Sequence, residues 1–472
     1  MPIVPVVDYR SAETSVAEAD VRATLDGRSP TYDALELVAS DADAILAALD
    51  LERPADRRRL VLARDPSRLA ADLARHRDRL GLVRADAVTP AVRALGWEGR
   101  SLFGVGRVRS LDEWPLTALL VPGPEGDGPV GPFDPAGLWT LVAGGDILLD
   151  RGVARQVKVL GKGVDFPFDG GTAEITGRFC CSAFGWPLPR TRRTGDAGAV
   201  RELLRDADLA IANFENPAPD RFRYHTRGTV FSADPALIEG LANAGIDWVS
   251  LANNHIGDAG RAGIVQTIEN LDEWGIAHGG AGRNVVEAHE PSILEAPGGV
   301  RVAILAYDAI AAVYAAGPDR PGSARLSVAA VRRDVRAARA AGADVVVVFP
   351  HWGVEYRARP TAGQRELAEA IVDAGADMII GNHAHWAAAL EVRDGRPIWY
   401  ALGNFVFDQA WSEPTMEGLT LELTFRGATL VQATMRPHIV LDQAQPNFLD
   451  PAGDGRVVLD QVFEASRGLL PW

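Results

Sequence analysis

The chain has 472 residues, of which 47% are hydrophobic and 24% are charged, with 48 glycines and 30 prolines. This composition indicates a globular protein of roughly two to four domains, and it excludes a wholly disordered, collagenous or coiled-coil chain. The formal net charge of -15 disfavours general binding to nucleic acid or to anionic membranes, although a local basic patch could still bind phosphate.

Residues 1–120 predict a small α/β domain. Helical spacing at 16–27 is followed by short apolar runs at 35–38 and 60–63, and residues 68–83 read as a helix leading into a short strand. Because histidines and carboxylates do not gather at turn residues here, we expect an accessory or binding domain. The next segment, 121–137, holds five prolines and five glycines in seventeen positions and predicts an interdomain linker without helix or strand.

From residue 138 the pattern changes to helices that alternate with nearly continuous apolar strands, which is typical of a layered α/β domain. Late strands are expected within 398–408, and a hairpin is expected around Arg426 and Gly427. We therefore predict one domain over 138–440 and a C-terminal extension over 441–472.

Metal-ligand residue types follow the apolar strands of this domain. The residues in question are Asp146 after LVAGG, Glu215 after LAIANF, Asn253, Asn254 and His255 after WVSLA, His351 after VVVVFP, and His383 and His385 after MIIGN. Ligands of open α/β sheets bind outside the carboxyl ends of the strands, so we expect five segments to converge on one edge. Carboxylates, an amide and imidazoles suit one or two divalent ions such as Mn, Zn or Fe.

The residue types in this set also suggest chemistry. A carboxylate can bridge two cations, and two metals about 3.5–4 Å apart can activate a water and stabilise both oxygens of an in-line displacement. His255 could protonate the leaving oxygen, with Asp258 orienting its ring. Taken alone, Asp146 could be a turn residue and His351 a structural histidine. The joint pattern favours a metal site.

The chain from about 138 to 440 resembles the CapA group (poly-γ-glutamate biosynthesis proteins) of the calcineurin-like metallophosphoesterases. The matching segments, in the family order, are GGDILLDRGV at 144–153, DLAIANFENP at 208–217, SLANNHIGDAG at 250–260, HWGVEY at 351–356, GADMIIGNHAHW at 375–386 and IWYALGNFVFD at 398–408. The resemblance implies a four-layer α/β/β/α sandwich with a dinuclear metal centre. The N-terminal segment is similar to part of a periplasmic solute-binding domain, although it is too short for two lobes.

The resemblance also implies roles for individual residues. Asp146 and His385 correspond to first-metal ligands, Glu215 to the bridging carboxylate, and Asn254, His351 and His383 to second-metal ligands. His255 resembles the histidine that assists the leaving group. Three residues are expected to contact substrate or shape the site wall: Arg151, which could hold an anionic group, Asn253, and Asn404 of the Gly403-Asn404 motif.

Two positions depart from the superfamily pattern. The usual Asp-x-His of the first motif reads Asp146-Ile147-Leu148, and the bridging residue is Glu215 rather than Asp. Both departures are shared by the CapA group. They leave open a mononuclear or loosely dinuclear site, and a substrate other than a phosphoester.

Further features have two interpretations each. The irregular stretch 155–200 holds Arg178, Arg190, Arg192 and Arg193 and is either an anion-binding cap or a solvated loop. The tryptophans near the motifs, Trp186, Trp352, Trp386 and Trp411, either line a cleft or pack in the core. Among the remaining histidines we expect His225 and His278 to lie near the site, and His76, His289 and His438 to be structural or surface residues.

Cysteine usage and the chain start bear on localisation. The only two cysteines, Cys180 and Cys181, are adjacent, which excludes a disulfide framework and favours two packed thiols. The first residues carry no secretion signal, and no apolar run reaches the roughly 18 residues of a membrane span. The sequence as it stands favours a cytoplasmic protein, and a longer natural chain leaves an extracellular location open.

The leading hypothesis is a metal-dependent hydrolase in which hydroxide held by the metal attacks a phosphoester or an amide, with His255 as the general acid. One alternative is a non-catalytic accessory protein of poly-γ-glutamate or capsule polymer assembly or export. Another is a tailoring enzyme of small-molecule biosynthesis with a repurposed metal site. The expected partner is a small-molecule or polymeric anionic substrate, and the sequence indicates no oligomeric state.

Overall fold

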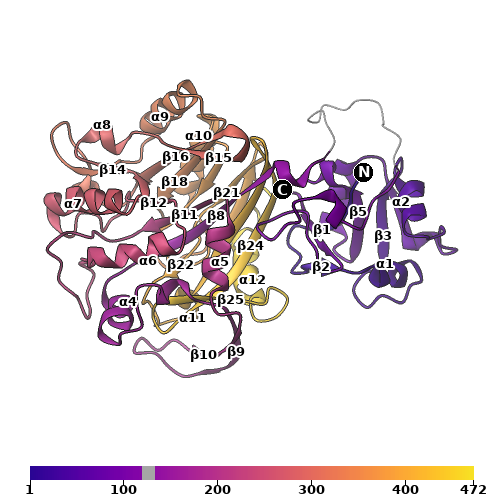
Figure 1. Ribbon diagram of the computed structural model, residues 1–472, viewed down its shortest axis with the longest axis horizontal. Helices are drawn as coiled ribbons and strands as arrows, with labels where there is room; N and C mark the ends of the chain where they lie inside the picture. The colour runs from indigo at the N-terminus through magenta and orange to yellow at the C-terminus, as the bar shows by residue number, and fades with distance from the viewer. Residues whose placement is uncertain (120–132) are drawn as a thin grey trace. The chain divides into compact units, whose positions relative to one another are not determined.

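The computed structural model describes residues 1–119 and 133–472 (Figure 1). These residues divide into an N-terminal unit, made of Met1–Thr140 with Glu422–Thr434, and a main unit, made of Leu141–Leu421 with Met435–Trp472. Most of the predicted linker lies outside the described residues. Pro135–Gly137, within that segment, form one turn of 3-10 helix, capped by the Asp134 side chain, so the expectation of no helix is wrong there.

The N-terminal unit is built on a five-stranded sheet in the order β4-β3-β5-β1-β6. Its strands are β1 (Ile3–Asp8), β3 (Ala34–Val38), β4 (Leu60–Ala63), β5 (Arg79–Arg84) and β6 (Val92–Ala94), and its helices are α1 (Glu18–Leu25), α2 (Ala42–Ala48) and α3 (Pro66–Arg75). Strands β2 (Ser15–Val16) and β7 (Gly96–Trp97) form a separate pair. Strands β4, β3 and β5 are parallel, and β4 lies at the edge of the sheet.

The main unit contains two large sheets. The first runs β10-β9-β25-β24-β23-β8-β11-β12-β13, with β22 beside β8, and the second runs β15-β16-β18-β19-β21-β20. The first sheet comprises β8 (Leu138–Ile147), β9 (Thr172–Phe179), β10 (Leu188–Gly195), β11 (Leu209–Phe214), β12 (Trp248–Ser250), β13 (Ala277–Gly279), β22 (Asn404–Val406), β23 (Glu417–Arg426), β24 (Thr429–Leu441) and β25 (Gln445–Leu449). The second comprises β15 (Ser292–Ala296), β16 (Val300–Asp308), β18 (Val345–His351), β19 (Met378–Ile380), β20 (Leu390–Arg393) and β21 (Arg396–Trp399). A small pair joins β14 (Ala281–Gly282) to β17 (Gly322–Ser323).

Helices cover the outer faces of both sheets (Figure 1). The longer ones are α5 (Ala199–Asp206), α6 (Ile238–Asn243), α7 (Gly260–Glu273), α9 (Val328–Ala340), α10 (Ala362–Asp373) and α12 (Arg456–Ala465), and the short ones are α4 (Arg151–Ala154), α8 (Val285–Ala288) and α11 (Glu413–Met416). The two sheets face each other, since the rings of Trp248 on β12 and Phe349 on β18 meet edge to face at 5.5 Å. The predicted α/β/β/α sandwich with a small α/β N-terminal domain is confirmed.

The C-terminal part of the chain differs from the expected domain boundaries. The predicted hairpin is confirmed as β23 and β24, but residues 422–434 at its tip belong to the N-terminal unit. Residues 441–472 are no separate extension, because β25 joins the first sheet and α12 lies in the same unit. In the turn before β25, Asp442 and Gln443 have φ of 53° and 58°. Turns with two positive φ values favour Asn-Gly or Asp-Gly, and because neither pair is present here, the sequence does not mark this turn.

The stretch expected to be irregular forms a two-stranded extension, β9 with β10. Three of its arginines contact side chains of the main unit: Arg178 binds Glu413, Arg192 binds Glu174, and Arg193 binds Gln445. These pairings favour a solvated surface over an anion-binding cap. Cys180 and Cys181 are exposed at the tip of this extension, so the expectation of packed thiols is wrong, because no core surrounds them there.

Glu417 gives the main unit a pH-dependent stability. This side chain begins β23, is 2% exposed, and its Oε1 has no hydrogen-bond partner among the described residues. Burial, followed by the charge of Glu413, raises the pKa of Glu417 from 4.5 to about 8. The folded protein therefore retains a proton that the unfolded chain releases above pH 4.5.

The resulting stability is greatest below pH 4.5 and is lost as the pH rises towards 8. We expect the free energy of unfolding, measured with urea, to carry a falling component of at most about 1.4 kcal/mol per pH unit. The Glu417→Gln variant should lack that component and be the more stable protein at pH 8, whereas the exposed control Glu295→Gln should keep it. A slope that is equal in both variants would contradict the assignment.

No helix among the described residues is both long enough and apolar enough to cross a bilayer.

Candidate metal centre

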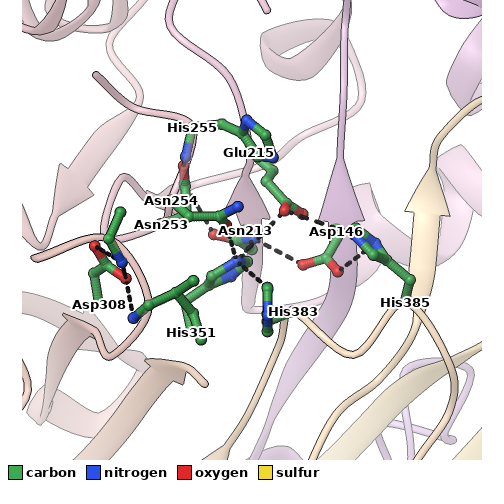
Figure 2. Close-up of polar contacts among 12 residues, drawn as sticks. Asp146, Asn213, Glu215, Asn253, Asn254, His255, Asp308, His351, His383 and His385 are labelled. Atoms are coloured by element: carbon green, nitrogen blue, oxygen red, sulfur yellow. Dashed lines mark hydrogen bonds and ion pairs between the residues drawn. The ribbon is translucent and has the colours of Figure 1, made fainter. Parts of the chain in front are cut away.

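The expected strand ends meet at one place (Figure 2). Parallel strands β8, β11 and β12 of the first sheet and parallel strands β18 and β19 of the second all end beside the site. The carboxylates and imidazoles gathered there are at most 5% exposed, and they are Asp146, Glu215, His351, His383 and His385. The burial of five ionisable side chains at one sheet edge requires mutual compensation or a bound cation.

The backbone around these residues is tightly constrained. A Cβ added at Gly145 would lie 1.9 Å from the carbonyl oxygen of Gly403, so only glycine lets β8 approach β22 next to Asp146. His383 and His385 both have positive φ, 91° and 55°, which is unfavourable for residues with a side chain. This conformation turns both imidazoles of the His-x-His segment into the site.

The first group of ligand atoms comes from Asp146, Glu215 and His385. The Nδ1 of His385 lies 3.4 Å from Asp146 Oδ2, and its Nε2 lies 3.9 Å from Glu215 Oε1. All three ligand atoms lie within 4.8 Å of one another, which is close enough for one ion.

The second group comes from Glu215, His351 and His383. The Nε2 of His351 lies 3.4 Å from Glu215 Oε1 and 3.1 Å from His383 Nδ1. The amide oxygen of Asn254 lies 2.7 Å from the same Nε2. Glu215 therefore belongs to both groups, which is the position of a bridging carboxylate.

The donor set fits divalent metal. Both Glu215 carboxylate oxygens and Asp146 Oδ2 are buried and accept no hydrogen bond from the described residues. Buried carboxylate oxygens without donors are costly, and one or two cations would remove that cost. The mixed oxygen and nitrogen ligands suit Zn, Mn or Fe, so divalent metal binding is supported, while the identity and number of ions belong to the proposal below.

The imidazoles differ in protonation. Burial lowers the pKa of His383 far below its ordinary value, and the neighbouring imidazoles, including that of His255, lower it further. Burial also disfavours protonated His385, but Glu215 and Asp146 outweigh it and raise its pKa to about 9. Burial also lowers the pKa of His351, but the charge of Glu215 outweighs this effect and raises that pKa above its ordinary value. Protons on these rings partly compensate the carboxylates when no metal is bound.

Asn213 connects the two groups and was not predicted. Its amide nitrogen donates to Asp146 Oδ1 at 2.7 Å and lies 3.2 Å from Nδ1 of His351. Strand register explains this position, because Asn213 of β11 pairs with Asp146 of β8. The residue stands within the apolar run LAIANF, where the only sequence signal is a polar side chain in an otherwise buried strand.

Asn253 bonds to the backbone at the ends of two strands. Its amide nitrogen donates to the carbonyl oxygen of Phe214 at 2.8 Å, and its amide oxygen accepts from the backbone of His255 at 3.1 Å. The fully buried side chain therefore joins the ends of β11 and β12, and its contact with a substrate stays a prediction.

Asn404 supports a ligand candidate. Its amide nitrogen donates to Gln409 and to the carbonyl oxygen of Thr415, so its Oδ1 is fixed as the acceptor of the His385 Nδ1 proton at 2.8 Å. That hydrogen bond leaves Nε2 of His385 as the nitrogen that faces Glu215.

The Asn404→Ala variant should lower metal affinity about 10–100-fold, because the orientation and tautomer of His385 would no longer be set. Isothermal titration of the metal-free protein with Mn²⁺ or Zn²⁺ measures this loss. Asn447→Ala is the matched control, since Asn447 is equally buried and bonds Gly171 on the far side of the sheet. Equal affinity losses in both variants would contradict the assigned role.

His255 and Asp258 form the expected pair. The Nδ1 of His255 lies 2.8 Å from Asp258 Oδ2. Two residues that the sequence did not indicate complete this arrangement: the Tyr314 hydroxyl donates to Asp258 Oδ1 at 3.2 Å, and the Phe231 ring lies 4.2 Å from the imidazole. The ring of His255 is thus held with Nε2 as its free nitrogen.

Arg151, which could hold an anionic group according to the sequence, is bonded to groups of the protein. Its Nε and Nη2 bind the carboxylate of Asp408, and its Nη1 donates to the carbonyl oxygen of Gly228 at 2.6 Å. The guanidinium also stacks over Phe231 at 4.8 Å. Because Asp408 occupies the fork of the guanidinium, Arg151 holds the segment around Phe231 in place, and its contact with a substrate stays a prediction.

Residues 220–232 form a loop that we call the covering loop. The imidazole of His225 bonds Asp150 at 2.5 Å, and the backbone of Phe231 donates to Asp258 at 2.8 Å. His225 therefore anchors this loop, whereas His278 pairs with Asp272 at 3.1 Å, away from the ligands. His289 and His438 have structural hydrogen bonds, to Asp334 and to Asn404 and Thr420.

Aromatic rings line one side of the centre. Tyr356 stacks on the ligand candidate His385 at 6.0 Å, and its ring also meets Trp386 at 6.5 Å and Trp411 at 6.2 Å. Trp352 instead packs in the core against Tyr400. Trp352 thus follows the core interpretation, whereas Trp386 and Trp411 lie beside Tyr356, where a cleft wall stays a prediction.

The two-sheet α/β sandwich with buried His, Asp and Glu groups at its strand ends is the arrangement that the resemblance to the calcineurin-like metallophosphoesterases implied. The sequence profile described as "Bacterial capsule synthesis protein PGA_cap" matches residues 140–409. The chain belongs to this family.

The chain is similar to several curated relatives. It is 36% identical over 221 residues to the capsule biosynthesis protein CapA of Bacillus anthracis, covering 45% of this chain and 54% of that one. It is 33% identical over 216 residues to the PGA biosynthesis protein CapA of Bacillus subtilis (45% and 57%). It is 29% identical over 294 residues to a probable polyglutamine synthesis accessory protein of Mycobacterium tuberculosis (57% and 74%). The chain spans about half the length of the two CapA proteins.

Among solved structures, the Haemophilus influenzae NAD nucleotidase aligns with a TM-score of 0.36 and 13% identity, over 64% of this chain and 50% of that one. The calcineurin-like phosphoesterase YfkN of Bacillus subtilis aligns with a TM-score of 0.36 and 13% identity, over 70% and 97%.

Proposed function

We propose that this chain is a metal-dependent hydrolase of an anionic substrate, a phosphoester or an amide. The observation that carries the proposal is Glu215, whose two buried oxygens have no hydrogen-bond donor among the described residues while the side chain is shared by two groups of ligand atoms. The proposed ligands are Asp146, Glu215 and His385 for one ion and Glu215, Asn254, His351 and His383 for the other. Divalent metal, when bound, supplies an activated water and offsets negative charge on the substrate.

His255 is the proposed general acid. Asp258 holds its Nδ1, so a proton on Nε2 is available to a leaving oxygen or nitrogen. The carboxylate of Asp258 also stabilises the protonated ring, and the Phe231 backbone and Tyr314 keep that carboxylate in place. In this scheme Asp258, Asn213 and Asn404 position other groups and do not touch the substrate.

The covering loop contacts the proposed general acid through Phe231. Its Phe231 ring lies between the guanidinium of Arg151 and the ring of His255. Three loop arginines, Arg221, Arg223 and Arg227, are exposed and make no ion pair with the described residues. They supply positive charge beside the site in a chain whose net charge is -15.

The test is a substrate panel with the full chain. Metal-free protein is loaded with Mn²⁺, Zn²⁺ or Fe²⁺ and assayed on p-nitrophenyl phosphate, bis(p-nitrophenyl) phosphate and γ-glutamyl p-nitroanilide. We expect hydrolysis of at least one compound that a chelator removes and added metal restores. Failure of the protein to bind any of these metals would overturn the proposal.

A second candidate function is that of an accessory protein that binds polymer without cleaving it. The similarity to a probable polyglutamine synthesis accessory protein favours it. Stoichiometric metal binding without hydrolysis of any compound in the panel would support this candidate over the hydrolase.

The covering-loop arginines predict a salt-dependent KM. Replacing Arg221, Arg223 and Arg227 together by Gln should raise KM for an anionic substrate about tenfold at low ionic strength, with kcat and metal content nearly unchanged. The difference should shrink at high salt, because exposed charges are screened. The control replaces Arg301, Arg332 and Arg336, which are exposed on the second sheet and on α9. A loss of metal in the loop variant, or an equal effect in the control, would contradict this role.

A further inference from the structure

Three cavities of the N-terminal unit lie at or near its edge strand β4, and two of them are lined by residues of that strand. One of about 570 Å³ lies along the face that carries Val61 and Ala63, and one of about 580 Å³ contacts Leu60 and Leu62. A third, of about 310 Å³, shares His76 and Arg79 with the first. Leu62 is 43% exposed. The strand is therefore open on the face of Leu62, whereas Ala63 on its other face is buried in the core.

The lining of these cavities is strongly basic. It contains seven arginines and three aspartates, in a chain with a net charge of -15. The arginines are Arg53, Arg57, Arg58, Arg59, Arg64, Arg68 and Arg79, and the aspartates are Asp33, Asp72 and Asp78. We call this surface the β4 groove. Helix α3 contributes Arg68 and Asp72 at a spacing of four residues, and His76 follows at its C-terminus.

Six of the seven arginines already face a carboxylate of the protein, and the charge available to a ligand is that of the most exposed ones. Arg57 makes no ion pair with the described residues. Arg58 pairs with Asp56 and Arg64 with its neighbour Asp65, and these two arginine side chains are 89% and 84% exposed. Ion pairs this exposed contribute little to stability, so an incoming carboxylate can replace the present partner. Arg79 differs, since it is bound to the buried Glu36 at 3.0 Å and forms part of the floor.

The outer edge of β4 is free to accept another strand. In the described sheet, β4 pairs only with β3, so its backbone groups on the other side have no strand partner. An open edge of this kind binds an extended peptide through main-chain hydrogen bonds. A second copy of this chain is a poor occupant, because two β4 grooves would bring like charges together. An acidic strand is the complementary one.

We propose that the β4 groove binds an extended acidic peptide segment of a partner, which adds a strand to the sheet at β4 and places carboxylates on the flanking arginines. This site lies in the N-terminal unit, outside the residues matched by the family profile, and does not depend on the metal centre or on hydrolysis. A backbone of α-linked residues matches the repeat of β4, whereas a γ-linked chain has a longer repeat and cannot pair with it residue by residue.

The experiment measures binding to the full chain by fluorescence anisotropy. The probe is a labelled ten-residue peptide of alternating Glu and Val, titrated at low and at high salt. Three further peptides accompany it: one with Lys in place of Glu, one with alternate backbone amides N-methylated, and a γ-linked oligoglutamate of equal charge. We expect only the first peptide to bind tightly, and its affinity to fall with salt.

The protein variant replaces Arg57, Arg58 and Arg64 by Glu. All three side chains are exposed, so the fold should persist, which circular dichroism checks. We expect at least a tenfold loss of peptide affinity, and no change for the control in which Arg301, Arg332 and Arg336 become Glu. Equal binding of the N-methylated peptide or of the γ-linked oligomer would overturn strand pairing at β4. Absence of binding, or equal loss in the control, would overturn the site itself.

Discussion

Replacement of Glu215 by Gln is expected to remove stoichiometric metal and, with it, hydrolytic activity. The substitution keeps the shape of the side chain and removes the one carboxylate that both groups of ligand atoms share. The loss should exceed the about 10–100-fold decrease typical of residues that only orient a metal ligand. Elemental analysis of the purified variant measures the metal, and the p-nitrophenyl assays measure the activity.

The folded state should survive this change. In the metal-free protein Glu215 is a buried carboxylate that faces the imidazoles of His351 and His385, so the neutral amide should leave the apo protein folded but somewhat less stable to urea. The matched control is Glu391→Gln, a fully buried carboxylate bound by Arg365 and Tyr400. It should lower stability and leave metal content unchanged. Full metal content in Glu215→Gln would refute the assignment of the centre.

Replacement of His255 by Ala is expected to lower the rate of hydrolysis by a factor that depends on the leaving group of the substrate. General acid catalysis contributes about 10²–10⁴-fold, and it matters most when the departing oxygen is strongly basic. Hydrolysis of an alkyl phosphoester should therefore fall by that factor, whereas release of p-nitrophenolate should fall far less. Metal content should not change. The Asp258→Asn variant should show the same pattern more weakly, because Asp258 acts only by holding the ring.

The control for this pair is His289→Ala. His289 forms a comparable imidazole–carboxylate pair with Asp334 at 2.9 Å. Asp334 lies on α9, which packs against the second sheet. Its removal should reduce stability without changing the dependence on the leaving group. Equal losses of both substrates in His255→Ala would show that the residue does not donate the proton.

The convergence of the ligand candidates was predictable because it depends on strand order and on the edge at which parallel strands end. Apolar runs mark β8, β11, β12, β18 and β19 directly, and a polar residue just past each run must lie at that edge. The metal roles of these residues remain a proposal, but their meeting in one buried cluster followed from the pattern.

The substrate contacts were not predictable, because spacing along the chain does not show where a donor points. Arg151 is bound to Asp408, which is 257 residues away in sequence, and Asn404 accepts from His385, which lies in another motif. Phe231 and Tyr314 come from loops without periodicity and could be found only by contact. Asn213 was not predictable for a third reason. It stands within a buried strand, and its role beside Asp146 becomes evident only when the neighbouring strand is known.

The hairpin of β23 and β24 has a consequence for how this protein can be dissected. Its tip belongs to the N-terminal unit, where Phe425 stacks on Trp139 at 4.2 Å, while its base belongs to the main unit. The chain therefore passes between the units three times, near residues 140, 421 and 434. A fragment that begins at residue 141 would keep the tip and lose the residues that cover it, exposing an apolar surface. Deletion of residues 1–140 therefore tests solubility before it tests function.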